Sequence, residues 1–80
     1  MTIQVRFFGS LSESVGETIE IELADAPTVG DLRARCAEMH AGAASVLSTC
    51  MVAVNTEFAE DATALSAGDE IAFLPPVSGG

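Results

Sequence analysis

The stretch TIEIELADAPTVGDLRARC, residues 18–36, changes its hydrophobic period halfway along. In its first part, isoleucine and leucine alternate with threonine and glutamate, which predicts a strand with one buried face. Farther on, Thr28 and Asp31 form the signature of a helix start, in which the threonine side chain accepts a backbone N–H as the N-cap. A strand followed this closely by a helix indicates a sheet with a helix packed against it.

The predicted helix carries one apolar stripe. Its members recur at spacings of three, four and three, and they are Val29, Leu32, Cys36 and Met39. Arg33 and Arg35 fall elsewhere on the helix, and Gly42 is the predicted stop. Residues 43–50 fit either a loop or a further turn of helix, and both interpretations stay open.

Strand patterns lie on both sides of this helix. Residues 2–8 alternate, residues 51–55 are typical of a buried strand, residues 57–59 of a short edge strand, and residues 70–74 of a last strand. A hairpin followed by a crossing helix and returning strands predicts an α+β protein. Its mixed sheet has about five strands, with one main helix packed on one face. We expect the first and last strands side by side and parallel at the centre, which is the order of the β-grasp, or ubiquitin-like, fold.

The chain is small and acidic. Its 80 residues fit one domain, and twelve acidic side chains against three arginines, with no lysine, give a formal charge of −9. This charge repels nucleic acid and anionic membranes, so we expect neither as a partner and expect partners with basic surfaces. The acidity would equally keep a small hydrophobic domain soluble. No signal segment precedes the first strand and no run reaches roughly 20 apolar residues, so we expect a cytoplasmic protein.

The cysteines and the histidine predict neither a metal site nor a disulfide. Cys36 and Cys50 lie fourteen positions apart without a C-x-x-C spacing, and the single His40 completes no recognisable ligand set. Cys36 belongs to the apolar stripe and Cys50 opens a strand pattern, so we expect both to be buried as small hydrophobic residues. His40 lies where the predicted helix ends, and we expect no catalytic role for it.

The last six residues are typical of an extended tail. Pro75 and Pro76 favour extended geometry and remove two backbone donors, while Gly79 and Gly80 carry no Cβ and can pass through a narrow channel. We predict a β-grasp domain over residues 1–74 and a flexible tail over residues 75–80, which reaches up to roughly 20 Å. The terminal carboxylate of Gly80 is the candidate reactive group, because another enzyme can activate it.

Three motifs resemble the small sulfur-carrier subunit of molybdopterin synthase, a ubiquitin-like family. They are Phe7-Phe8-Gly9, Val54-Asn55, and the run LSAGDEIAFLPPVSGG over residues 65–80. The resemblance implies that Gly80 is adenylated and converted to a thiocarboxylate, which donates sulfur to a pterin precursor in molybdenum cofactor biosynthesis. In the family pattern an alanine replaces Gly9 and a basic residue replaces Ser12, so a partner contact of that basic residue is in doubt here.

The resemblance also implies the partners. They are the large subunit of molybdopterin synthase, which supplies the catalytic groups, an adenylyltransferase similar to ubiquitin-activating enzymes, which uses ATP, and a sulfur donor such as a cysteine desulfurase or a rhodanese. The chain would bind no cofactor and would not be an enzyme by itself. The residues that enter the partner's channel would be Pro75, Pro76, Val77, Ser78 and Gly79.

The strand alternation predicts where these partners dock. Phe8, Phe58 and Leu74 lie on the outward side of their strands, and we expect them, together with Val77 of the tail, to form the partner interface. The alternative is that Phe58 and Leu74 are core residues of a sheet covered on both faces.

Other functions fit a carrier tail of this kind. The chain could carry sulfur for thiamine thiazole synthesis, cysteine synthesis or tRNA thiolation, or it could be a protein modifier joined to lysines of other proteins. It could also be a plain β-grasp interaction module with incidental glycines. The Phe-Phe start and the PPVSGG end favour molybdopterin synthesis.

Overall fold

The structure is a computed structural model that describes residues 1–76 of the 80. The predicted site residues Val77, Ser78, Gly79 and Gly80 therefore lie outside the described residues. The elements in chain order are β1 (Thr2–Phe7), α1 (Ser10–Ser14), β2 (Thr18–Glu22), α2 (Val29–Met39), the 3₁₀ helix η1 (Ala41–Ala43), α3 (Ala44–Thr49), β3 (Met51–Val54), β4 (Glu57–Ala59) and β5 (Ile71–Leu74).

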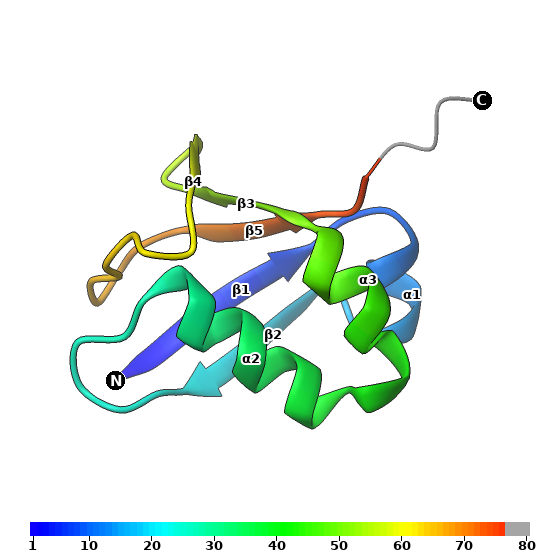
Figure 1. Ribbon diagram of the computed structural model, residues 1–80, viewed down its shortest axis with the longest axis horizontal. Helices are drawn as coiled ribbons and strands as arrows, with labels where there is room; N and C mark the ends of the chain where they lie inside the picture. Colours follow the sequence, from blue (N-terminus) through cyan, green and yellow to red (C-terminus); the bar gives the residue numbers. More distant parts are fainter. Residues whose placement is uncertain (77–80) are drawn as a thin grey trace.

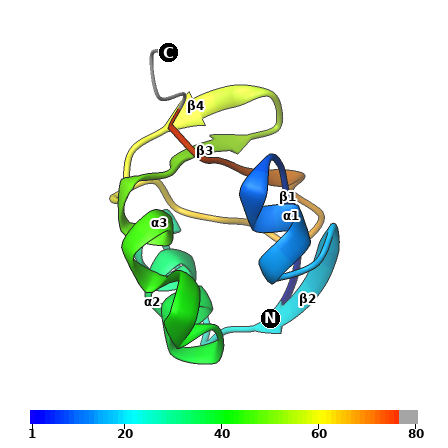
Figure 2. The same cartoon turned by 90° about the vertical axis from the view of Figure 1, so that its right-hand side faces the viewer.

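The five strands form one mixed sheet in the order β2-β1-β5-β3-β4. The first and last strands are neighbours and run parallel, with Val5 paired to Ile71 and Phe7 to Phe73. The other three pairings are antiparallel. Helices α2 and α3 lie together on one side of this sheet (Figures 1 and 2). The predicted β-grasp arrangement, with its central parallel pair, is confirmed.

The start of α2 and the turn after β3 are determined by residues close together in the sequence. Thr28 is the N-cap: its Oγ1 accepts from the Asp31 N–H at 3.2 Å, and an Asp31 carboxylate oxygen accepts from the Thr28 N–H at 2.9 Å. The predicted capping box is thus present. Asn55 and Thr56 have positive φ of 51° and 72°, which matches the two-residue hairpin turn between β3 and β4.

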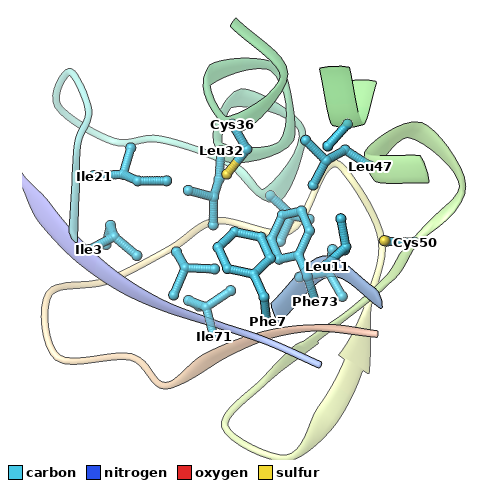
Figure 3. Close-up of a cluster of buried hydrophobic side chains, with 14 of the residues drawn as sticks. Ile3, Phe7, Leu11, Ile21, Leu32, Cys36, Leu47, Cys50, Ile71 and Phe73 are labelled. Carbon is cyan, nitrogen blue, oxygen red and sulfur yellow. The ribbon is translucent and has the colours of Figure 1, made fainter. Parts of the chain in front are cut away.

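One hydrophobic core lies between the sheet and the helices (Figure 3). At its centre the rings of Phe7 and Phe73 lie 5.4 Å apart between centroids and are tilted by 53°. Leu32 of α2 and Leu47 of α3 cover them from the helical side, and both are fully buried. Each such side chain contributes roughly 1.5–3 kcal/mol to the free energy of unfolding.

The predicted end of α2 is confirmed at His40 and wrong at Gly42. The helix ends at Met39, because His40 leaves the helical conformation with φ −132° and ψ 68°, and Gly42 lies within η1 instead. Met39 was placed on the buried stripe but is 44% exposed. The core at this end is filled by Leu47 of α3, which resolves the open stretch as helix rather than loop.

Two expectations for the next strand also need correction. Cys50 does not open a strand but caps the C-terminus of α3, although its predicted burial is confirmed. Residues 51–55 are not a buried strand on both faces. Met51 is 52% exposed whereas Val52 is 1% exposed, because the helices cover only one face of β3.

Arg33 links α2 to the end of α3 and to the loop that follows β4. One guanidinium nitrogen donates to the carbonyls of Leu47 and Cys50 at 2.6 and 2.8 Å, and a second pairs with Asp61 at 2.9 Å. The carbonyl of Leu47 belongs to the last turn of α3 and also accepts from the Cys50 N–H at 3.4 Å, a long bond that leaves it free to accept from Arg33. Arg33 therefore acts as a C-cap for α3, a role that its position off the apolar stripe did not indicate.

The described helices are short. Across residues 1–76 none of them combines the length and the apolar character that a membrane crossing requires.

Candidate functional site

The face of the sheet opposite α2 and α3 carries two rows of side chains. Residue pairing across β1, β5, β3 and β4 aligns Arg6, Ala72, Ala53 and Phe58 in one row. The second row begins one residue beyond β1 and contains Phe8, Leu74 and Met51. We call the apolar members of both rows the outer apolar patch; they are Phe8, Met51, Ala53, Phe58, Ala72 and Leu74.

The outer apolar patch is open to solvent. Phe58 is 66% exposed and Phe8 is 41% exposed, while Leu74 is half-buried beside Met51. Large apolar side chains grouped on one face of a small domain are typical of a docking surface. The β2 end of the same face is polar instead, with Gln4 donating to Glu20 at 3.4 Å and Thr2 donating to Glu22.

The structure brings together three of the predicted interface residues and adds one. Phe8, Phe58 and Leu74 share the outer apolar patch, so Phe58 and Leu74 are not core residues of a doubly covered sheet. Val77 lies outside the described residues. Met51 was missed, and the signal that could have found it is the alternation with Val52, which places Met51 on the outward face.

The chain leaves the sheet beside this patch. Pro75 directly follows β5, and its side chain lies against Gly9 in the turn between β1 and α1. The Phe8 N–H donates to the carbonyl of Phe73 at 3.2 Å, which extends the β1–β5 ladder to the point of exit. Pro75 is half-buried and Pro76 is exposed, so the stem of the predicted tail begins next to Phe8.

The two thiols are poor nucleophiles. Burial raises the pKa of Cys36 to about 12 and also raises the pKa of Cys50, and in both cases the nearby Arg33 only partly offsets the effect of burial. Both thiols therefore stay protonated at neutral pH, and the thiolate is the reactive form. Within residues 1–76, no group of three or more His, Cys, Asp and Glu side chains is arranged to hold a metal ion.

Known proteins share this fold and this sequence pattern, and residues 5–80 match the ThiS family. The chain belongs to the ThiS family. The molybdopterin synthase sulfur carrier subunit of Chlamydomonas reinhardtii is 39% identical over 83 residues, which covers 100% of both chains.

Two solved structures of the same fold cover 100% of both chains as well. SAMP1 from Haloferax volcanii is 30% identical with a TM-score of 0.85. The second is a chain of the complex of subunits 1 and 2 of the molybdopterin-converting factor from Helicobacter pylori 26695, 34% identical with a TM-score of 0.70.

Proposed function

We propose that this chain is the sulfur-carrier subunit of a molybdopterin synthase and that its working group is the terminal carboxylate of Gly80. The observation that carries the proposal is the 39% identity, over the full length of both chains, with a curated molybdopterin synthase sulfur carrier subunit. The exit of the chain beside an exposed apolar patch supports it, because a carrier must present its end and its docking surface to the same partner.

The chemistry needs an activated carboxyl group. A Gly80 carboxylate oxygen attacks the α-phosphorus of ATP on the activating enzyme, and pyrophosphate leaves. Hydrosulfide then attacks the carbonyl carbon of the adenylate and displaces AMP, which leaves a thiocarboxylate. Where the donor is a persulfide, its attack gives an acyl disulfide, and a second thiol cleaves the S–S bond, releasing the thiocarboxylate and forming a disulfide with the donor. That anion is a softer and stronger nucleophile than a carboxylate and donates its sulfur to the pterin precursor. In this proposal the chain binds no cofactor of its own.

The catalytic groups would come from the large subunit. The solved relative from Helicobacter pylori is a complex of subunits 1 and 2 of the molybdopterin-converting factor, and the outer apolar patch is the surface with which this chain would form such a complex. The protonated thiols of Cys36 and Cys50 favour a chain that is not an enzyme by itself. The remaining partners would be the adenylyltransferase and a cysteine desulfurase or rhodanese, in the cytoplasm.

The tail would provide the rest of the contact. Six residues from Pro75 to Gly80 span up to roughly 20 Å when extended, which is enough to enter a pocket in a second protein. In this proposal residues 1–74 form the domain and residues 75–80 form a flexible tail. Pro75 to Gly79 would enter the partner's channel, and Val77 would add to the contact that the outer apolar patch makes.

A second function is favoured by one observation. The likeness to SAMP1, a small archaeal modifier protein by name, reaches a TM-score of 0.85 at 30% identity. A modifier joins its terminal carboxyl group to amines of other proteins, so it leaves adducts of higher mass in a cell extract. A carrier for another sulfur pathway would differ only in its partner.

The decisive experiment is the intact mass of the chain after incubation with an activating enzyme, ATP and a sulfur donor. The expected mass increases by the difference between one sulfur and one oxygen, and the change lies in the C-terminal peptide. A chain with one alanine appended after Gly80 is the control and should gain nothing. Full restoration of cofactor synthesis by that extended chain in a carrier-deficient strain would contradict the proposal.

A further inference from the structure

Arg6 is a cation on the outer face of the sheet, directly beside the outer apolar patch. Its neighbours across the sheet are Thr18 on β2 and Ala72 on β5, both short side chains, and Arg6 itself is exposed. The guanidinium carbon lies 5.5 Å from the centroid of the Phe8 ring, which is within the range of a cation–π interaction. The guanidinium is thus held over one end of the patch.

The other two arginines satisfy their charge within the chain. Arg33 pairs with Asp61, and Arg35 pairs with Glu38. Arg6 forms no ion pair with any residue from 1 to 76, although the chain has twelve acidic side chains. Its charge is therefore available to a group from another molecule.

Arg6 also stands between two hollows of the surface. One, of about 430 Å³, lies over β1 and β2 and is bounded by Gln4, Thr18 and Glu70. The other, of about 250 Å³, lies between Phe8 and Glu17. Both hollows are open, and Arg6 lines each of them, so the side chain of a docked protein can reach the guanidinium from either side.

We propose that Arg6 is a specificity-determining residue of the docking surface and receives a carboxylate side chain of the large subunit at the rim of the outer apolar patch. This inference rests on the proposed function, because the partner is the large subunit. An arginine stacked on an aromatic ring loses little freedom on binding and presents paired N–H donors that fit a carboxylate. Arginine, tryptophan and tyrosine are also the residue types most enriched among interface hot spots, whose truncation costs the most binding free energy.

The charge of the chain makes this contact selective. A chain of formal charge −9 attracts basic surfaces and repels acidic ones, so a partner carboxylate is tolerated only opposite a cation. A large subunit with an acidic side chain at this point would dock in one register. A protein that presents only basic groups would meet Arg6 as a repulsive contact.

Two variants with the same change in net charge test this. The dissociation constant of the purified large subunit is measured by calorimetry with wild type, Arg6→Gln and Arg35→Gln, at low and at high salt. Arg35 lies on α2, away from the outer face, and serves as the matched control. We expect Arg6→Gln to weaken binding by roughly tenfold or more at low salt and by less at high salt. Arg35→Gln should bind as wild type does, or slightly more tightly.

The outcomes separate the two proposals. Binding of Arg6→Gln that equals or exceeds that of wild type would overturn the role of Arg6 and leave the proposed function intact. A wild-type chain that does not bind the large subunit would overturn both. An Arg6→Lys variant with intermediate affinity would support the contact, since it keeps the charge but loses the planar donor pair. An unchanged thermal unfolding midpoint of each variant confirms that the fold is intact.

Discussion

Gly9 and Pro75 lie so close together that an ideal Cβ at Gly9 would be 3.0 Å from Cγ of Pro75. Gly9 also has φ 62° and ψ −141°, a conformation that residues with a Cβ rarely adopt. The stem of the tail thus rests directly on the turn that follows β1. Any side chain at position 9 must both strain the backbone and push Pro75 away.

The first prediction concerns this contact. Gly9→Ala should lower the free energy of unfolding by about 1–3 kcal/mol, because the backbone conformation at position 9 is strained for alanine. It should also slow adenylation of Gly80 if Pro75, whose ring must shift by a few tenths of an ångström to admit the new Cβ, directs the tail. Urea unfolding measures the first effect, and pyrophosphate release with the activating enzyme measures the second.

Gly68→Ala is the matched control for that prediction. Gly68 also has a positive φ, of 88°, but an ideal Cβ there meets nothing within 4 Å and the residue is distant from Pro75. Gly68→Ala should lower the free energy of unfolding without changing the rate at which Gly80 is adenylated. Equal rates for Gly9→Ala and Gly68→Ala would show that the contact with Pro75 does not direct the tail.

Met51 is predicted to be part of the partner interface. It lies opposite Leu74 in the outer apolar patch and is half exposed, so Met51→Asp should leave the fold intact while burying a charge in the complex. We expect affinity for the large subunit to fall by at least about 2 kcal/mol, as at an interface hot spot. The readout is co-elution by size-exclusion chromatography together with calorimetry.

Met39 provides the comparison for the patch. It is similarly exposed but lies at the end of α2, on the helical side of the sheet. Met39→Asp should bind the large subunit as wild type does, while Phe8→Asp and Phe58→Asp should behave like Met51→Asp. Normal assembly of all three patch variants would refute the docking surface.

Arg33 is predicted to matter for stability rather than for binding. Arg33→Met removes donors from the carbonyls of Leu47 and Cys50 and leaves Asp61 unpaired, so the free energy of unfolding should fall by about 2–4 kcal/mol. Arg33→Lys should restore little of this, since lysine lacks the planar donor pair. Arg35→Met should cost no more than about 0.5 kcal/mol, because its pair with Glu38 is exposed. Denaturant titration distinguishes these cases.

The raised pKa values of the two thiols predict that the protein becomes less stable at alkaline pH. Burial raises the pKa of Cys36 from 9.0 to about 12, so above pH 9 the unfolded thiol releases its proton while the folded thiol keeps it. The free energy of unfolding should then fall by up to about 1.4 kcal/mol per pH unit for this group, between pH 9 and pH 12. Cys50, whose pKa is also raised, adds to the effect.

This range isolates the cysteines, because the chain has no lysine and no tyrosine that would titrate there. Urea unfolding of wild type at a series of pH values gives the slope. A Cys36→Ala/Cys50→Ala chain should be less stable at neutral pH but should lose much of that slope. A slope that survives in the double variant would assign the alkaline effect to another group.

Sequence patterns predicted those features that depend on near neighbours along the chain. The capping box of Thr28 and Asp31 is set by local hydrogen bonds and was predicted correctly. The alternation of the strands also placed Phe8, Phe58 and Leu74 outward. The end of α2 was predicted in part: His40 is the C-cap, as expected, whereas Gly42, a common stop signal, lies within η1 instead of ending α2.

The amino-acid order by itself determined the order of the five strands and of α2, the inward faces of β1, β2 and β5, and the family to which the chain belongs. Only the tertiary structure decided that Met51 joins the patch, that Arg33 caps α3, and that Pro75 rests on Gly9. The physical reason is distance along the chain. Periodicity and capping act over a few residues, whereas these contacts join segments whose approach is fixed by sheet order, register and the packing of helices on one face.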